Sequence, residues 1–200
     1  MLCIFRTVLL VGLIFITSAH AKYIKIGVIC PTEGALQVEG LGILYGVKAA
    51  VSSMKSDGVL KPNDQIEVIH YNTSTTGTIP MDIIVTYSDG SSQLFPASKS
   101  DRNCAPGMSA SAATKLANDN VQFVIGAFCS ATTKAAALIL DQHKIPLLTP
   151  GAIKKNLTQR KFRYLFRICN REDYEGIAIL NFISKKLKPK SIYIVNTRFS

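Results

Sequence analysis

Short apolar runs alternate along the chain with segments in which apolar positions recur every three or four residues. The runs are rich in β-branched residues and are bounded by turn-forming residues, which is typical of buried strands. They lie at 23–30, 65–71, 121–126, 145–148, 164–169 and 191–195. The segments with helical spacing or alanine-rich composition lie at 43–56, 108–118, 132–143 and 172–187. Strands that are apolar throughout and alternate with helices predict an α/β fold, a parallel sheet flanked by helices.

Two further features belong to this pattern. A glycine-containing loop over 33–42 precedes the first helix, and the last helix is predicted to be amphipathic. Its apolar face carries Ile177, Leu180, Ile183 and Leu187.

An insertion at about 75–100 interrupts the alternation of strands and helices. Residues 83–87 and 93–95 are strand-like and flank a glycine-containing turn, which predicts a β-hairpin. The residues of this insertion indicate a surface hairpin and carry no functional pattern.

Ligands of parallel α/β sheets bind outside the carboxyl ends of the strands. The segments predicted to lie there are 30–39, 127–133, 149–153 and 170–174. We therefore expect a binding site, where there is one, among these four loops.

The first 21 residues predict a secretory signal peptide. Arg6 supplies a short positive region, an apolar run follows over 7–16, and Ala19-His20-Ala21 matches the small-x-small cleavage pattern. The run is too short for a comfortable membrane span, which needs about 20 residues. We expect cleavage near Ala21 and a soluble chain that is periplasmic or secreted.

The formal net charge of +10 resides in the last quarter of the chain. Residues 22–150 balance ten basic against ten acidic side chains, whereas 151–200 carry twelve basic and three acidic ones. No RNA-recognition, zinc-finger or helix-turn-helix pattern accompanies this charge, so no nucleic-acid partner is predicted. Three histidines argue against a His-rich metal centre, and no metal is expected.

Two motifs that would suggest cofactor binding or catalysis are incomplete. Gly40-Leu41-Gly42 lacks the third glycine of a dinucleotide-binding turn, because that position is Tyr45. Cys129 follows a predicted strand as a nucleophile would, but it has no glycine on either side. The residues therefore predict neither an enzyme nor a bound cofactor.

Four cysteines remain after the signal peptide, namely Cys30, Cys104, Cys129 and Cys169. An even number in an oxidising compartment indicates disulfide bonding. Four cysteines allow three connectivities, and their pattern alone does not choose among these. A metal site is the competing interpretation, but the sequence has no C-x-x-C pair.

An ordered set of segments also carries a family resemblance. These are KIGVICPTEG at 25–34, GVKAAV at 46–51, KLANDNVQFVIGAFCSATT at 115–133, KIPLLTPGA at 144–152, LFRICNREDYEG at 165–176 and KKLKPKSIYIV at 185–195. In this order they resemble type I periplasmic solute-binding proteins, particularly the Leu/Ile/Val-type receptors of amino-acid ABC transporters. The resemblance spans nearly all of residues 22–200, apart from the insertion.

The resemblance implies a fold of two α/β lobes joined by three crossover strands, with the ligand in the cleft between them. Residues 22–170 would then form most of lobe one, including the hairpin at about 75–100. Residues 171–200 would begin lobe two, most of which would be missing from this chain.

The resemblance also implies which residues contact the ligand. Ser130 matches the position that holds the ligand carboxylate, and Thr132 and Thr133, in the same first helical turn, are weaker candidates. A helix N-cap is the structural alternative for Ser130. Gly151 would offer its carbonyl to the ligand. Ile153 stands where the family has a threonine hydroxyl, so one hydrogen bond to a charged group, about 1.5–3 kcal/mol, would be lost.

Two more expectations follow from positions that match this family. Glu39 stands where an aromatic residue often lines the cleft, and its carboxylate would favour a cationic or amide-bearing ligand. The alternative for Glu39 is a solvated loop residue. A disulfide between Cys104 and Cys129 is implied. Cys30 and Cys169 then either pair with each other or remain thiols, and we expect thiols.

The resemblance therefore implies the extracytoplasmic solute-binding component of an ABC transporter. It would bind an amino acid or a related small polar or amide ligand without chemistry or cofactor, and would present it to a membrane permease. The alternatives are the ligand-binding domain of an extracellular sensor or receptor, and a nonfunctional truncated fragment.

Overall fold

The computed structural model describes residues 21–74, 83–86, 92–95, 104–159 and 162–193. Within them, one parallel sheet has the strand order β2-β1-β5-β6-β7. Its strands are β1 (Tyr23–Cys30), β2 (Gln65–Asn72), β5 (Phe123–Gly126), β6 (Leu147–Thr149) and β7 (Leu165–Arg167). The long β1 and β2 pair over their whole length, from Tyr23 beside Gln65 to Cys30 beside Asn72. The prediction of an α/β fold with a parallel sheet is confirmed.

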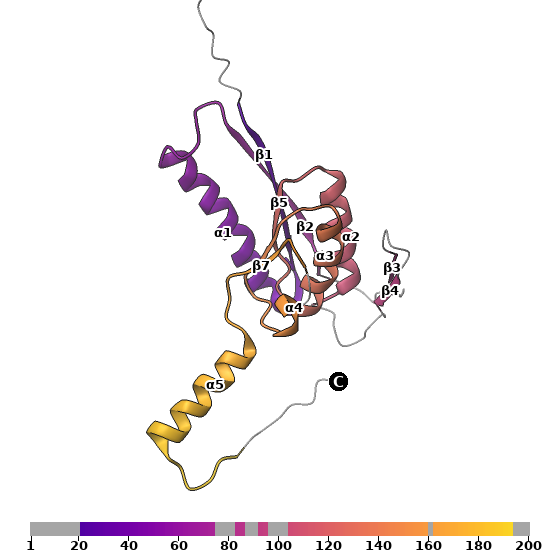
Figure 1. Ribbon diagram of the computed structural model, residues 1–200. Coiled ribbons are helices and arrows are strands. Elements are labelled where there is room, and N and C mark those ends of the chain that lie inside the picture. Colours follow the sequence, from indigo (N-terminus) through magenta and orange to yellow (C-terminus); the bar gives the residue numbers. More distant parts are fainter. Residues whose placement is uncertain (1–20, 75–82, 87–91, 96–103, 160–161, 194–200) are drawn as a thin grey trace, which may run out of the picture.

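Helices cover both faces of this sheet (Figure 1). One face is covered by α1 (Gln37–Ser56) and the other by α2 (Pro106–Asn118) and α3 (Ser130–Gln142). A short helix, α4 (Asn156–Gln159), follows β6. The predicted hairpin is present as antiparallel β3 (Ile83–Thr86) and β4 (Ser92–Phe95), while its turn lies outside the described residues.

The alternation of side chains along β1 divides the core into two clusters. Ile26, Val28 and Cys30 face α1 and pack with its Leu44 and Val47. Ile29 faces the other way, into the larger cluster.

The larger cluster brings two alanine-rich helices together. Its core includes Ala110, Ala112 and Ala113 of α2 with Ala135, Ala136 and Leu140 of α3. Small side chains allow the two helix backbones to approach closely. At Gly27 of β1 a Cβ atom would lie 2.7 Å from Leu116 Cδ1, so α2 also presses tightly on the sheet.

The first helix begins earlier than its apolar spacing predicts. A 3-10 turn at Gly34–Leu36 leads directly into α1 at Gln37, so Glu39 lies in a helical turn and not in a loop. Gly40 explains the early start, because a Cβ there would lie 1.5 Å from the Pro31 carbonyl oxygen. The helix therefore starts where glycine lets it touch the end of β1, and this contact overrides the low helix propensity of glycine.

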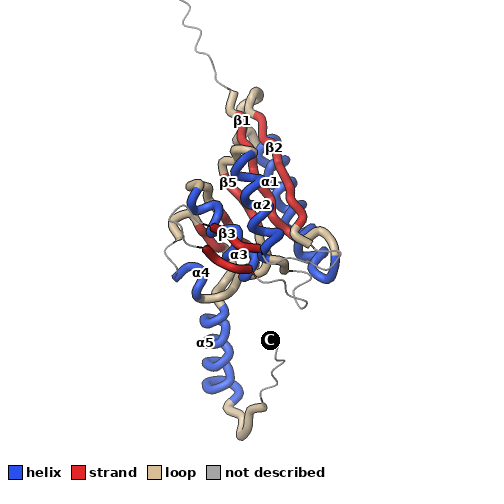
Figure 2. Tube along the Cα trace, turned by 90° about the vertical axis from the view of Figure 1, so that its right-hand side faces the viewer, coloured by secondary structure: helices blue, strands red, loops and turns tan. Residues whose placement is uncertain are grey.

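The last helix, α5 (Glu172–Phe182), continues into a π-helical turn at Ile183–Leu187 and projects away from the sheet (Figures 1 and 2). None of its residues is buried, and Leu180 is 64% exposed. The prediction of a helix here is confirmed, but the prediction of an amphipathic helix is wrong. Exposed apolar side chains surround the helix, since Ile177 and Ile179 lie on opposite sides of it. The strand predicted at 191–195 is absent over 191–193, and the remaining two positions lie outside the described residues.

Within the described part of the chain, no helix combines the length and apolarity that crossing a bilayer requires. The predicted signal peptide lies outside the described residues.

Candidate functional site

The carboxyl ends of the five parallel strands meet at one edge of the sheet, here called the carboxyl edge (Figure 1). The segments that leave this edge are 31–36, 73–74, 127–129, 150–155 and 168–171. They include the loops in which the sequence predicts a ligand site, so its candidate residues share one edge of the molecule.

Side chains from the end of β2 hold the loop that follows β1. Asn72 Oδ1 accepts hydrogen bonds from the backbone N–H groups of Thr32, at 3.0 Å, and Ser74, at 2.8 Å. Ser74 Oγ in turn accepts from the Glu33 N–H and donates to the Glu33 carbonyl. Asn72 and Ser74 were not singled out from the sequence, because their partners lie about forty residues away. Together they fix the approach to α1 and hence the place of Glu39, whose side chain is exposed.

A tight turn after β5 places the amino end of α3. Gly126 has φ +126°, and a Cβ there would lie 2.0 Å from the Ile29 carbonyl oxygen, so only glycine fits. Ala127 follows with φ +47°, a conformation that is rare for residues with a side chain. Two buried hydroxyls, of Thr133 and Thr149, donate to the Ala127 carbonyl at 2.6 and 2.9 Å. These bonds hold the turn in its left-handed conformation.

Ser130 is the first residue of α3, at the carboxyl edge. The N-cap position is Cys129, so the N-cap alternative for Ser130 is wrong. Its Oγ accepts a hydrogen bond from the Lys154 N–H at 3.2 Å, which joins α3 to the loop after β6. This bond uses a lone pair of the hydroxyl and leaves its proton free to be donated to another group.

Thr132 lies inside the protein and not at the surface of this edge. It is 3% exposed, and its hydroxyl donates to the Cys129 carbonyl at 2.8 Å. The structure therefore gives Thr132 a framework role in the first turn of α3, while its predicted ligand contact has no geometric support.

The loop after β6, residues 150–155, carries the other two expected contacts and is called the β6 loop below. Gly151 packs against Phe128, because a Cβ at Gly151 would lie 2.5 Å from a carbon of that ring. Ile153 is 38% exposed, which is compatible with an apolar contact to a ligand. Ser130 and the β6 loop are thus brought together, as their predicted common role requires.

Arg167, at the end of β7, holds the same loop. Its Nη1 donates to the carbonyls of Ala152, at 3.1 Å, and Lys154, at 2.9 Å, and its Nη2 donates to Thr158 Oγ1 at 2.8 Å. The sequence analysis did not single out Arg167. The available signal was an arginine inside the otherwise apolar predicted strand at 164–169.

The first turn of α5 is bonded to the β6 loop as well. The Glu172 N–H donates to the Ile153 carbonyl at 3.0 Å, and Glu172 Oε1 accepts from the Lys155 N–H at 3.3 Å. Asp173 forms ion pairs with Arg171 and with Lys155. The hydrogen bond from Arg171 lowers the pKa of the Asp173 carboxyl to about 2, so this carboxylate is charged at any physiological pH.

The cysteines divide as the family resemblance implied. Cys104 and Cys129 form a disulfide, with their Cα atoms 5.9 Å apart, so the segment before α2 is tied to the turn before Ser130. Cys30 and Cys169 are thiols. Burial raises the pKa of Cys30 to about 12, which keeps it protonated and unreactive.

His70 is the one imidazole in the described core. It lies on the α1 face of β2, opposite Val28, and its buried Nε2 has no hydrogen-bond partner. Burial, with a smaller contribution from Lys48, lowers the pKa of His70. The side chain is therefore neutral at pH 7. It faces α1, on the opposite side of the sheet from α2 and α3.

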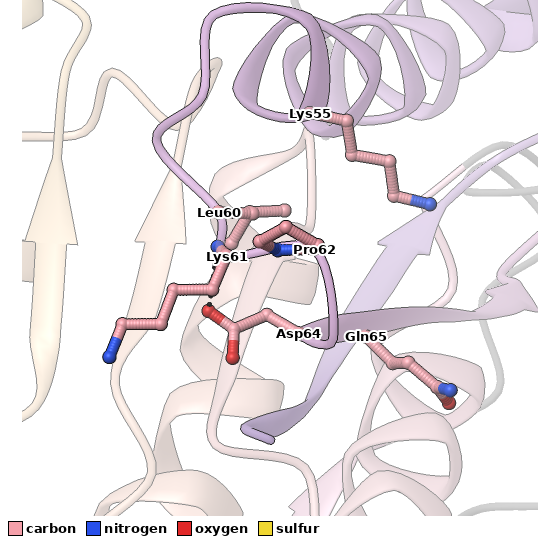
Figure 3. A pocket seen from close by; sticks show the side chains of 6 residues that line it. All are labelled: Lys55, Leu60, Lys61, Pro62, Asp64 and Gln65. Carbon is pink, nitrogen blue, oxygen red and sulfur yellow. Dashed lines mark hydrogen bonds between the residues drawn. The ribbon is translucent and has the colours of Figure 1, made fainter. Parts of the chain in front are cut away.

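A hollow of about 350 Å³ lies at the opposite end of the sheet from the carboxyl edge. It is lined by Lys55, Leu60, Lys61, Pro62, Asp64 and Gln65, between the end of α1 and the start of β2 (Figure 3). The Asp64 carboxylate accepts hydrogen bonds from the backbone N–H groups of Lys22 and Lys61. These bonds lower the pKa of Asp64 and give it a structural role.

Comparison with known proteins assigns the family. The family described as "Receptor family ligand binding region" matches residues 44–195, about three quarters of the chain. This chain belongs to that family. The match includes α2, α3, the β6 loop and α5, and it begins after the β1 strand, segment 31–36 and Glu39.

Relatives and solved structures agree with this assignment. The Leu/Ile/Val-binding protein of Escherichia coli (strain K12) is 25% identical over 188 residues, 94% of this chain and 43% of the relative. The leucine-specific-binding protein of Salmonella typhimurium is 33% identical over 98 residues, 49% of this chain and 27% of the relative. LivJ, a branched-chain amino acid transporter substrate-binding protein of Streptococcus pneumoniae solved with isoleucine, superposes with a TM-score of 0.62 at 26% identity.

These relatives confirm the predicted resemblance to Leu/Ile/Val-type solute-binding proteins, and each of them is named as a binding protein. The superposition covers 84% of this chain but 39% of the S. pneumoniae chain. The chain thus spans less than half the length of the relatives named here.

Proposed function

We propose that the carboxyl edge forms one wall of a binding site for an amino acid or a related small polar or amide ligand. The observation that carries this proposal is the pairing of Ser130 with the β6 loop through the Lys154 N–H. The relatives support the ligand class, since they are named for binding leucine, isoleucine and valine.

The chemistry of this wall suits a ligand carboxylate. The first N–H groups of a helix lack partners within the helix, and the helix dipole places partial positive charge there. Ser130, at the start of α3, adds a hydroxyl whose proton is free. Arg167 and Lys154 add positive charge to the same edge. A carboxylate placed at the start of α3 would therefore be stabilised.

The ligand's ammonium or amide group would bind the Gly151 carbonyl. Ile153 would supply apolar contact and no hydrogen bond, so this wall provides one polar contact fewer than a threonine would. Glu39 would add negative charge on the β1 side of the edge and favour a ligand with a cationic or amide group. Thr132 would support Ser130 through its bond to the Cys129 carbonyl.

The proposed domain organisation rests on the same family resemblance. Residues 22–170 would form lobe one, and α5, which is tied to the β6 loop yet exposed throughout, would begin lobe two. Residues 1–21 would direct the chain to the periplasm or the exterior, and a membrane permease of an ABC transporter would receive the ligand. Mass determination of the N-terminus of the exported protein tests cleavage near Ala21.

The second candidate is the ligand-binding domain of an extracellular receptor. The description of the matched family, a receptor ligand-binding region, favours it. The same wall would then recognise the same class of ligand, and binding would alter a signalling partner instead of a permease.

Thermal melting of the exported protein tests the ligand class. The probes are L-leucine, L-leucinamide, which lacks the carboxylate, and 4-methylpentanoate, which lacks the amino group. A ligand that binds only the folded state raises the melting temperature. We expect L-leucine to give the largest rise, and either analogue to give less. A cooperative transition that none of the three probes shifts would contradict the proposal.

A further inference from the structure

Arg167 occupies a position from which it controls the shape of the β6 loop. It is the last residue of the edge strand β7, and its side chain is half-buried beside the loop. One guanidinium bonds three groups, the carbonyls of Ala152 and Lys154 and the hydroxyl of Thr158. The two carbonyls flank Ile153, so this single side chain determines the path of the loop on both sides of that residue.

The chemistry of arginine matters for this role. Its planar guanidinium presents several N–H donors in a rigid arrangement, whereas lysine presents one ammonium on a flexible stem. A lysine at this position would hold one carbonyl and leave the relation between the two carbonyls free. The geometry therefore uses a property that only arginine has.

The loop is also held from its other side. The Lys154 N–H donates to Ser130 Oγ, and the Ile153 carbonyl accepts from the Glu172 N–H. Each residue from Ala152 to Lys155 thus has a backbone group in a hydrogen bond to α3, β7 or α5. Among the described residues, the Gly151 carbonyl takes part in no such bond. Together with the Pro150 carbonyl and the N–H groups of Gly151, Ala152 and Ile153, it is one of the backbone groups of the loop that remain for a ligand.

The charge of Arg167 is not neutralised by an acid within the described residues. Its three acceptors are two carbonyls and a hydroxyl, all of them uncharged, and the ion pairs of this region join Asp173 to Arg171 and Lys155. The positive charge of Arg167 therefore adds to the potential at the carboxyl edge and favours an anionic group there.

We propose that Arg167 is a positioning residue for ligand binding, which holds the β6 loop so that Gly151 and Ile153 lie beside Ser130. It acts through the loop and does not itself touch the ligand. This inference rests on the proposed function of the carboxyl edge, and it adds the residue that organises the site.

Two substitutions test the role of Arg167. Arg167→Lys keeps the charge and removes the planar donor group, while Arg167→Met removes both. Arg163 provides the matched control, because it is exposed, lies just before β7 and has no recorded side-chain hydrogen bond in the described part of the chain. Arg163→Lys and Arg163→Met are therefore made in parallel.

The first measurement is the Kd for L-leucine by titration calorimetry, beside the melting temperature without ligand. We expect Arg167→Met to weaken binding about 10-fold or more, because a charge-assisted hydrogen-bond set is lost. Arg167→Lys should weaken it by a smaller factor, and both Arg163 variants should bind like the unchanged protein. A merely structural role would lower the melting temperature but leave the Kd at a temperature well below melting unchanged, and that result would overturn the proposal.

The second measurement separates this proposal from the proposed function. Amide hydrogen exchange of residues 151–155 reports the order of the β6 loop without any ligand, and amides in the middle of α3 serve as the internal reference. We expect faster exchange in the loop of Arg167→Lys, with unchanged exchange in α3. If the unchanged protein binds none of the three probes, the proposed function fails, and loop exchange then decides whether Arg167 positions the loop. Unchanged exchange in both Arg167 variants would overturn the positioning role.

Discussion

At the scale of single residues, Ser130 connects the framework to the proposed chemistry. Its hydroxyl accepts from the Lys154 N–H and retains a proton to donate. Replacement of Ser130 by alanine removes both functions at once. We expect this replacement to affect binding more than folding, because Ser130 lies at a helix start and not in the core.

We predict that Ser130→Ala weakens binding of L-leucine about 10- to 100-fold, since one hydrogen bond to a charged group is worth about 1.5–3 kcal/mol. The melting temperature without ligand should change little. Ser111→Ala, at an exposed position of α2, is the control and should leave both quantities unchanged. Calorimetric titration measures the effect, and an unchanged Kd in Ser130→Ala would remove Ser130 from the site.

His70 makes the stability of the fold depend on pH. Burial, and to a lesser extent Lys48, lowers its pKa below the ordinary 6.5. The unfolded chain therefore binds more protons than the folded one between the two pKa values. The stabilisation is complete above about pH 6.5 and is lost as the pH falls through the lower, folded-state pKa.

We predict that the melting temperature falls as the pH is lowered from 7.5 to 5.5, and that His70→Gln flattens this dependence. His143, which is exposed at the end of α3, provides the control. His143→Gln should keep the slope of the unchanged protein. Differential scanning calorimetry at a series of pH values measures both slopes, and equal slopes in the two variants would show that His70 is not the titrating group.

At the scale of elements, the disulfide joins the entry of α2 to the entry of α3. Cys104 and Cys129 are separated by 25 residues, and the bond fixes the turn from which Ser130 begins. In the chain-entropy account, closing a loop of this size stabilises the folded state by about 3–4 kcal/mol.

We predict that the double variant Cys104→Ser, Cys129→Ser loses about this free energy of unfolding in urea titration. Cys169→Ser, which replaces a half-buried thiol, is the control and should cost far less. A reducing agent should destabilise the unchanged protein and not the double variant. If reduction left the urea midpoint of the unchanged protein in place, the bond would not contribute to stability.

Helices and strands were predictable from the sequence where one local property, such as apolar composition, determines them. Strands buried on both faces are apolar, so β5 and the second half of β1 stand out in the sequence. The start of α1 was not evident in the sequence, because it depends on the close contact of Gly40 with the Pro31 carbonyl. The apolar residues of α5 were evident in the sequence as well, but they do not show what covers the helix.

The roles of the candidate site residues were predictable only from their match to positions in a known family. Ser130 and Gly151 follow strand ends, and a rule about parallel sheets directs attention to them. Arg167 and Asn72 were not identified as site residues, because they bond to backbone groups that are distant in the sequence. Thr133 and Thr149 lie in the predicted loops, but their bonds to the Ala127 carbonyl were not predicted. Residues that shape loops through hydrogen bonds leave no periodic pattern.

At the scale of the whole molecule, α5 is attached to the site yet covered by nothing within the described residues. Its first turn is bonded to the β6 loop, while Ile177, Ile179, Leu180 and Phe182 are each more than half exposed. A helix that exposes this many large apolar side chains to water promotes association. Because the first turn of α5 is hydrogen-bonded to the β6 loop, a segment or protein that covers α5 would lie next to the proposed binding site.

We predict that the chain associates with itself in a concentration-dependent manner through α5. The double variant Ile177→Lys, Leu180→Lys should shift sedimentation velocity profiles toward the monomer, because two ammonium groups cannot be buried in an apolar contact without a large cost. Tyr45→Lys is the control, since Tyr45 is an equally exposed apolar residue on α1, away from α5. It should leave the association unchanged. A monomeric unchanged protein at tens of micromolar would contradict the prediction, and equal effects of the α1 and α5 variants would show that added charge, and not the α5 surface, controls association.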